Sequence, residues 1–333
     1  MSYGLAWALF GICTVTIFLA SRRLTAAADE IALGTGLGRV FIGSVLLAAV
    51  TSLPEVATEA AAASMRLVDI AVGDLFGSNI YNMTILAVGG IVWGRGALLG
   101  VASPSHLATA FLGMLLAAIA ALALVTHPNV GFLGIGIEIY TILALYAVGI
   151  WSLRRARLSQ APDPQPGPAA RVASKGRGLA RTWAEFLISA GFVIAAAIFL
   201  SKSADVIATA TGLGKTFIGT LLVAATTSFP ELITSIFAVR IGAIDLAVGN
   251  VLGSNIFNMN ILLVSDIFYR DGYILSAASQ AHVITALVGL VLSGLVGLAI
   301  LRPISWRLGR VSLESLLILA AYFIGIYLVF LHR

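Results

Sequence analysis

The chain has 333 residues, of which 59% are hydrophobic and 11% are charged, and its mean hydropathy is +1.02. Soluble domains carry about 25% charged residues, so this composition excludes an ordinary soluble enzyme and indicates folding within a lipid bilayer. The net charge of +5 would suggest a nucleic-acid partner for a soluble protein, but here the basic residues lie between apolar segments and report membrane topology.

Apolar segments of about 20 residues, the length that crosses a bilayer, recur from one end of the chain to the other. The sequence therefore predicts an all-α integral membrane protein with ten transmembrane helices. The predicted spans are 3–20, 38–65, 68–93, 105–126, 131–153, 183–201, 214–240, 244–269, 279–300 and 311–331. Residues 22–36 and 202–213 are expected to be polar connectors or short amphipathic pieces.

Residues 158–180 form a predicted linker with four prolines and few apolar side chains, typical of a flexible or partly polyproline segment. The linker separates a first half, residues 1–157, from a second half, residues 181–333, with five spans each. If the N-terminus is placed outside, 15 of the 20 Lys and Arg residues fall on the inner side. Basic residues are in excess on the cytoplasmic side of membrane proteins, so we expect a cytoplasmic linker and external termini in the cell (inner) membrane.

The two halves contain an internal repeat. Residues 36–86 align with 212–262 without a gap, at an offset of 176, and 27 of 51 positions are identical. The offset covers five predicted spans, an odd number, so the two copies should cross the membrane in opposite directions. Inverted repeats with broken helices at the midplane are typical of secondary transporters. An old duplication kept for packing would match best at apolar positions, whereas these identities concentrate in Thr, Ser, Pro, Glu, Gly and Asn.

Each repeat places a Thr-Ser-x-Pro-Glu block in mid-span and a Gly-Ser-Asn-x-x-Asn block in the next span. Proline breaks a helix and is expected to free carbonyl oxygens just before it. A charged side chain at the bilayer centre costs about 2.5–3.5 kcal/mol, so paired glutamates predict a cation site. Ca²⁺ takes about six to eight oxygen ligands. The predicted metal ligands are Glu55, Glu231, Thr51, Ser52, Thr227, Ser228, Ser78, Asn82, Ser254, Asn258 and the carbonyls of Ala48 and Ala224.

Other polar residues have simpler explanations. Any single Ser, Thr or Asn in a membrane bundle can serve interhelical hydrogen bonding, and we expect that role for Asn79 and Asn255. Asp69 and Asp245 start their spans and are expected to cap helices, while Asp74 remains ambiguous, with vestibule lining one alternative. Three acids are given no repeat partner and no site role, namely Glu138, Asp266 and Glu314. The histidines lie near the ends of the predicted spans and are expected at the membrane interface.

On these two paired blocks the sequence resembles the sodium/calcium exchanger membrane-region family of the cation/calcium exchanger superfamily, in its prokaryotic type. The resemblance implies one Ca²⁺ site and adjoining Na⁺ sites shared by both repeats, no cofactor, and a first and sixth span that slide across the rest. Proton-coupled relatives tend to carry a Gly-Asn-x-x-Glu block, so the resemblance implies the sodium-using branch. Two departures are Asn258, where several relatives have aspartate, and Glu59, where the second repeat has Ser235. The first argues against K⁺ cotransport, and the second adds a relay or vestibule acid.

The sequence therefore predicts an antiporter that exchanges Ca²⁺ for Na⁺ by alternating access, with the bilayer as its environment and no obligate protein partner. A proton-coupled exchanger, or one for another divalent cation, is the alternative on the same fold. An intramembrane hydrolase using Ser52 or Ser228 would need a general base within reach, and no histidine is predicted at mid-span. A structural or sensor protein would not need matched glutamates in mid-membrane.

Overall fold

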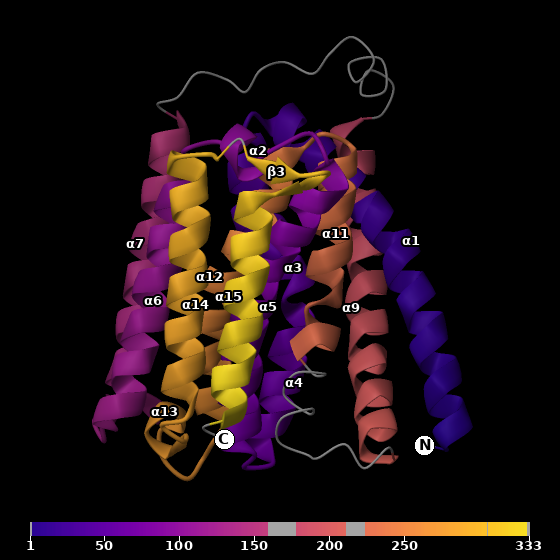
Figure 1. Ribbon diagram of the computed structural model, residues 1–333. Coiled ribbons are helices and arrows are strands. Elements are labelled where there is room, and N and C mark those ends of the chain that lie inside the picture. Colours follow the sequence, from indigo (N-terminus) through magenta and orange to yellow (C-terminus); the bar gives the residue numbers. More distant parts are fainter. Residues whose placement is uncertain (1, 159–177, 211–223, 305, 332–333) are drawn as a thin grey trace.

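The computed structural model describes residues 2–158, 178–210, 224–304 and 306–331. These residues form an all-α bundle whose long helices run side by side, apart from two short hairpins (Figure 1). Eight described helices are long and apolar enough to cross a membrane, and one bent helix pair makes a ninth. The eight are α1 Tyr3–Thr35, α5 Val68–Trp93, α6 His106–Thr126, α7 Ile137–Leu158, α9 Leu179–Ala210, α12 Ile244–Phe268, α14 His282–Leu301 and α15 Leu313–Leu331.

Helices α1 and α9 are longer than the sequence predicted. The expected connector at 22–36 is wrong, because α1 continues without a break to Thr35 and buries Leu24, Ala28 and Ile31 at helical spacing. The expected connector at 202–213 is also wrong as far as residue 210, where α9 ends. Helix α9 begins at Leu179, so the end of the predicted linker is helical. Residues 159–177, the body of that linker, lie outside the described residues.

The bent pair corresponds to the predicted span 38–65. It comprises α2 Gly38–Phe41, the π-helical segment η1 Ile42–Leu47, α3 Ala48–Thr51 and α4 Leu53–Ser64, with a bend of 43°. Pro54 lacks an N–H and interrupts the helical hydrogen bonds at this point, as its position in mid-span predicts. In the second repeat, α11 Phe229–Arg240 begins one residue before Pro230. The earlier part of the predicted span 214–240, up to residue 223, is not described.

Two hairpins mark the two ends of the bundle. Strands β1 Gly131–Phe132 and β2 Ile135–Gly136 pair next to the short helix α13 Ile274–Ala277, at the lower end in Figure 1. Strands β3 Arg307–Leu308 and β4 Val311–Ser312 pair at the upper end. The predicted spans 131–153 and 311–331 therefore began too early, since their first residues form hairpin strands. We call the two ends the α13 end and the β3 end.

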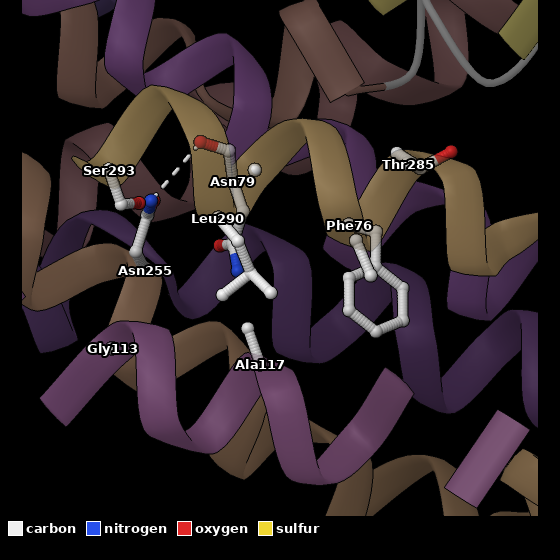
Figure 2. A pocket seen from close by; sticks show the side chains of 10 residues that line it. Phe76, Asn79, Gly113, Ala117, Asn255, Thr285, Leu290 and Ser293 are labelled. Carbon is white, nitrogen blue, oxygen red and sulfur yellow. Dashed lines mark hydrogen bonds between the residues drawn. The ribbon is translucent and has the colours of Figure 1, made fainter. Parts of the chain in front are cut away.

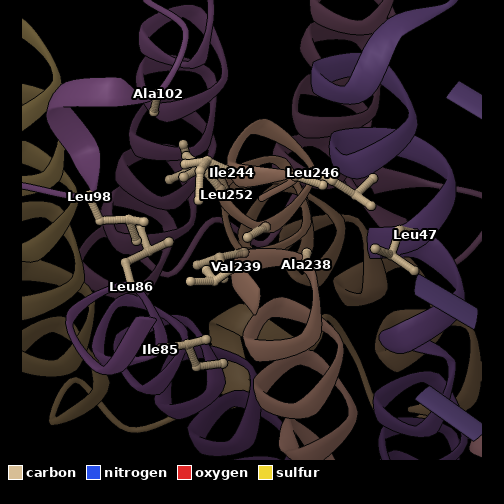
Figure 3. Close-up of a cluster of buried hydrophobic side chains, with 14 of the residues drawn as sticks. Leu47, Ile85, Leu86, Leu98, Ala102, Ala238, Val239, Ile244, Leu246 and Leu252 are labelled. Atoms are coloured by element: carbon tan, nitrogen blue, oxygen red, sulfur yellow. The ribbon is translucent and has the colours of Figure 1, made fainter. Parts of the chain in front are cut away.

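Helices α5 and α12 occupy the centre of the bundle. Their most apolar windows are 72% and 67% buried, compared with 28% for α1. Figure 3 shows part of the core around them, with Leu86, Val239 and Leu252 from three different helices in one apolar cluster. The 3-10 turn η2 Leu99–Val101 closes this core at the β3 end. Both Gly-Ser-Asn-x-x-Asn blocks thus lie on the two most enclosed helices.

Close backbone contact joins the broken helix to α12. A methyl group at Gly253 would collide with the carbonyl oxygen of Ser44, and one at Gly43 would lie 2.7 Å from the carbonyl oxygen of Leu246. Only glycine leaves room for two helix backbones to approach this closely. The broken helix and the second Gly-Ser-Asn-x-x-Asn block are therefore held directly against each other.

Candidate cation-binding site

Two buried glutamates occupy equivalent places at the starts of two helices. Glu55 is the third residue of α4, and Glu231 is the third residue of α11, each directly after a proline. Both side chains are completely buried. The first turn of a helix carries unpaired N–H groups and the positive end of the helix dipole, which favour a carboxylate there.

Reciprocal hydrogen bonds bring the two helix starts together. The Ser52 hydroxyl donates to Glu231 Oε1 at 3.0 Å, and the Ser228 hydroxyl donates to Glu55 Oε1 at 3.2 Å. Ser254 on α12 also donates to Glu231 Oε1, at 3.3 Å. Each glutamate therefore has one carboxylate oxygen that accepts a serine hydroxyl. The serine of each Thr-Ser-x-Pro-Glu block bonds to the glutamate of the other block.

Four buried oxygen atoms at this centre have no hydrogen-bond partner within the described part of the chain. They are Glu55 Oε2, Glu231 Oε2, Asn82 Oδ1 and Asn258 Oδ1. All four side chains are fully buried. A buried polar atom without a partner is costly, and oxygens that can only accept are satisfied by a donor or by a cation. The four atoms come from two pairs of positions that match between the repeats.

The asparagines of α5 and α12 are tied to each other through their amide nitrogens. Asn82 Nδ2 donates to Asn255 Oδ1 at 3.0 Å, and Asn258 Nδ2 donates to Asn79 Oδ1 at 3.1 Å. The expected helix-bridging role of Asn79 and Asn255 is confirmed by these bonds. With both amide nitrogens engaged, the free amide oxygens of Asn82 and Asn258 are the atoms left for a ligand.

A small cavity lies behind this asparagine cluster, toward α6 and α14. Figure 2 shows Asn255 bonded to the Asn79 carbonyl oxygen, at 3.1 Å, beside Gly113, Ala117 and Leu290. The cavity measures about 10 Å³. A single water needs at least about 10–15 Å³ of such volume. It is therefore a packing gap at the edge of the asparagine cluster and no substrate site.

The threonines and alanines before the breaks already have partners. Thr51 Oγ1 donates to Asn250 Oδ1 at 3.2 Å, and Thr227 Oγ1 donates to Asp74 Oδ1 at 3.4 Å. The expectation that the breaks free the carbonyls of Ala48 and Ala224 is wrong, because each accepts the backbone N–H of the serine four residues later at 3.0 Å. Only a second lone pair on each carbonyl is left for a cation. Their part as ligands stays a prediction.

Two further acids belong to this region, although neither was among the predicted metal ligands. Asp74 and Glu59 are fully buried, and each has one oxygen without a partner in the described structure, Asp74 Oδ2 and Glu59 Oε1. Ser78 lies 3.5 Å from both Asp74 Oδ1 and Thr227 Oγ1. The signal in the sequence was that, within the aligned repeats, an acid stands opposite a neutral residue only at these two positions, Glu59 opposite Ser235 and Asp74 opposite Asn250.

No three His, Cys, Asp or Glu side chains among the described residues lie close enough to hold one metal ion together. An ion at this centre would therefore be bound by the two glutamates with neutral oxygens from Ser and Asn side chains. Such a set of oxygens suits hard cations like Ca²⁺ and Na⁺ rather than metals that prefer nitrogen or sulfur.

The helix-start aspartates cap helices other than their own. Asp69 accepts the Ser279 N–H at 2.8 Å and lies 3.2 Å from His282 Nε2, so it closes the start of α14 at the α13 end. Asp245 does the same for α6 at the β3 end, accepting the Ser103 N–H at 2.6 Å and contacting His106 Nε2 at 3.1 Å. His106 is the first residue of α6, near a span end as expected, and its side chain is fully buried.

The unassigned acids also need a correction. Glu138 and Glu314 do match at the offset of 176, and each follows a hairpin at the start of its helix. Glu314 Oε1 accepts the Leu99 N–H at 3.2 Å. Asp266 accepts the backbone N–H groups of residues 136 and 274, each at 2.7 Å. Asp266 and Glu314 thus tie helices to loops at the ends of the bundle, away from the central glutamates.

Sequence comparison finds related proteins over most of the chain. The profile of the family described as "Sodium/calcium exchanger protein" matches residues 5–153 and 182–331. CaxA of Alkalimonas amylolytica, named as a candidate antiporter, is 29% identical over 302 residues, which cover 82% of this chain and 87% of that protein. The inner membrane protein YrbG of Escherichia coli K12 is 28% identical over 260 residues, 78% of each chain.

Structural comparison finds the same architecture in a solved protein. The sodium-calcium exchanger NCX_Mj, in crystals soaked with 2.5 mM Na⁺ and 0.1 mM Ca²⁺, superposes with a TM-score of 0.71 at 24% sequence identity. The match covers 97% of this chain and 98% of that one. The arrangement of helices is therefore shared along almost the whole length of both proteins.

Proposed function

The chain belongs to the sodium/calcium exchanger family, and from this premise we propose that it is a secondary antiporter that exchanges Ca²⁺ for Na⁺ across the membrane by alternating access. Membership of a transporter family and the set of membrane-spanning helices already make it an integral membrane cation antiporter. The identity of the exchanged ions, their ligands and the mechanism are the proposal.

The observation that carries the proposal is the set of four unpartnered oxygens at the centre of the bundle. Two carboxylate oxygens, on Glu55 and Glu231, and two amide oxygens, on Asn82 and Asn258, are buried without a donor in the described structure. Two negative charges in a low-dielectric interior repel each other and favour a bound cation. The hydroxyls of Ser52, Ser228, Ser78 and Ser254 complete the proposed ligand set, together with Thr51, Thr227 and the carbonyls of Ala48 and Ala224.

Competition for the same charges couples the two ions in this proposal. One Ca²⁺, or several Na⁺, neutralises Glu55 and Glu231, but both sets cannot occupy the pocket together. A carrier without ions retains two bare buried charges and resists the change between its two open states. Exchange then follows from alternating access, and slippage of the unloaded carrier at rates near those of exchange would contradict this mechanism.

We further propose that the protein consists of two inverted repeats of five spans, ten in all, with α11 completing the tenth. Support comes from contacts that recur with the repeats exchanged, such as Ser52 with Glu231 and Ser228 with Glu55. The two aspartate caps recur in the same way at opposite ends of the bundle. Such reciprocity is expected when two copies of one sequence face each other across a twofold axis in the membrane plane.

Alternating access in this scheme uses α1 and α9 as the moving pair. Helices α1 and α9 contact each other more extensively than either contacts any other described element. They lie together at one side of the bundle (Figure 1). We place both termini outside and the 158–180 linker in the cytoplasm, because of the excess of basic residues on that side. The name of the relative YrbG supports the inner membrane as the location.

Uptake of ⁴⁵Ca²⁺ into proteoliposomes tests the proposal. Vesicles loaded with Na⁺ and diluted into Na⁺-free buffer should accumulate Ca²⁺, and Glu55→Gln should abolish the accumulation. Glu314→Gln is the matched control, because it changes another buried acid in the same way while its amide oxygen can still accept the Leu99 N–H. Uptake that follows an imposed pH gradient instead would replace Na⁺ by H⁺ as the coupling ion. Uptake that survives Glu55→Gln would refute the glutamate site.

A further inference from the structure

Two buried acids lie beside the central glutamates, outside both paired motifs. Glu59 is one helical turn beyond Glu55 on α4, in the direction of the α13 end, where the Arg66–Asp271 ion pair joins the end of α4 to the loop after α12. Asp74 lies on the neighbouring helix α5. Both are fully buried. Two carboxylates that the proposed exchange site does not use are therefore buried on the side of Glu55 that faces the α13 end.

Each of these acids is only half satisfied. Glu59 Oε2 accepts the Ser265 hydroxyl at 2.9 Å, and Asp74 Oδ1 accepts those of Ser78 and Thr227 at 3.5 and 3.4 Å. Glu59 Oε1 and Asp74 Oδ2 have no partner within the described residues. The two carboxylates lie on neighbouring helices, at positions whose counterparts in the other repeat are directly hydrogen-bonded. No Lys or Arg among the described side chains is bonded to either carboxylate. Such an arrangement is stabilised by a shared cation.

The matching positions of the other repeat show what the packing itself requires. Ser235 takes the place of Glu59 and Asn250 that of Asp74, and the two are bonded directly, with Asn250 Nδ2 donating to Ser235 Oγ at 3.0 Å. Asn250 also donates to Thr234 Oγ1 at 3.0 Å and accepts from Thr51. Ser235 and Asn250 thus join α11 to α12 with neutral side chains, and neither has an unpartnered side-chain atom. Packing alone therefore does not explain the two acids.

We propose that Glu59 and Asp74 form a second cation site, which takes Ca²⁺ and lies between the central glutamates and the α13 end. The unpartnered oxygens of the two acids are its first ligands, and the Ser265 hydroxyl, which already bonds to Glu59, is within reach as a neutral one. Because no three acids in the described structure are placed to share one ion, this pair and the central pair bind separate ions. The site has no counterpart toward the β3 end, so the two faces of the carrier differ in how they load Ca²⁺.

Equilibrium binding of ⁴⁵Ca²⁺ to the full-length protein in detergent, without Na⁺, separates this site from the central one. Glu55→Gln/Glu231→Gln should remove the central site and leave residual Ca²⁺ binding. Adding Glu59→Ser/Asp74→Asn, which installs the residues of the other repeat, should abolish the residual Ca²⁺ binding. Thermal unfolding and gel filtration check that each variant is folded.

The outcomes also separate this inference from the proposed function. A central double variant that binds no Ca²⁺, or whose binding is unchanged by Glu59→Ser/Asp74→Asn, would overturn the second site and leave Na⁺/Ca²⁺ exchange untouched. If the wild type shows no Na⁺-driven Ca²⁺ uptake but the central double variant still binds Ca²⁺ through Glu59 and Asp74, the proposed exchange is refuted and the second site stands.

Transport provides a second, sided readout. In proteoliposomes, Glu59→Ser/Asp74→Asn alone should raise the half-saturating Ca²⁺ concentration about tenfold or more, about 1.4 kcal/mol, when Ca²⁺ is supplied at the α13 end. The half-saturating concentration at the β3 end should stay unchanged. An equal change at both ends would show that the two acids act on the central site and would overturn the proposal.

Discussion

Replacing Glu231 by glutamine tests the central site most directly, because the structure shows how little else it would change. Glu231 Oε1 accepts the hydroxyls of Ser52 and Ser254 at 3.0 and 3.3 Å, and an amide oxygen can accept the same bonds. The side chain is fully buried and keeps its size and shape. The substitution therefore removes one of the two facing charges and leaves the packing in place.

Relative to the wild type, Glu231→Gln is expected to be less stable when Ca²⁺ is bound and more stable when Ca²⁺ is absent. Removing one partner of a buried charge pair costs about 3–5 kcal/mol, so Ca²⁺ should bind roughly 10²- to 10³·⁵-fold more weakly. At a Ca²⁺ concentration of about 100 times the wild-type Kd, the wild type gains about 2.7 kcal/mol of stability and the variant less than about 0.4 kcal/mol. Without Ca²⁺ the variant should be the more stable protein, since a charge at the bilayer centre costs about 2.5–3.5 kcal/mol.

Thermal unfolding of the purified protein, in chelator and in Ca²⁺, measures both effects. For a chain of this length Ca²⁺ should raise the Tm of the wild type by about 4 °C and that of Glu231→Gln by less than about 1 °C, while the Tm in chelator should be higher for the variant. Glu314→Gln should respond to Ca²⁺ as the wild type does. A variant that keeps the full Ca²⁺ shift would refute the assignment of Glu231 as a ligand.

Two further predictions concern the scaffold that holds the site. Gly253→Ala should lower the free energy of unfolding by about 1–3 kcal/mol, because the added methyl would meet the Ser44 carbonyl, whereas Gly294→Ala, which meets nothing within 4 Å, should be neutral or stabilising in denaturant titrations. His106→Ala should cost about 1–3 kcal/mol by leaving buried polar groups near Asp245 unpaired, and a Tm equal to that of the wild type would show that the contact contributes nothing.

The paired motifs made the central residues predictable from the sequence. A proline directly before a glutamate in mid-span fixes a helix break and places the acid at the first turn of the next helix, as found at Glu55 and Glu231. The asparagine bridges were predictable for the same reason, since Asn79 and Asn82 leave α5 on different sides. Local chemistry in each motif was enough to find these features.

Other features depended on neighbours that the sequence does not reveal. Thr25 and the basic and acidic residues around it suggested a polar connector, yet its hydroxyl is buried and bonds to the carbonyls of Ser21 and Thr234, so the helix continues. The contact of His106 with a carboxylate was missed because its partner, Asp245, lies 139 residues away in the chain. Polar residues in a membrane helix can face a protein interior as well as water, and hydropathy cannot distinguish the two.

The differences between the repeats carry as much information as their identities. Identical residues, such as the two glutamates, supply what both faces of a carrier need, whereas Glu59 and Asp74 supply charge on one side only. Their counterparts Ser235 and Asn250 bond to each other, so the second repeat fills these two positions with neutral side chains that have no unpartnered atom. A carrier whose ion is scarce on one side of the membrane gains from acids on that side, because they raise the local cation concentration without altering the shared central site.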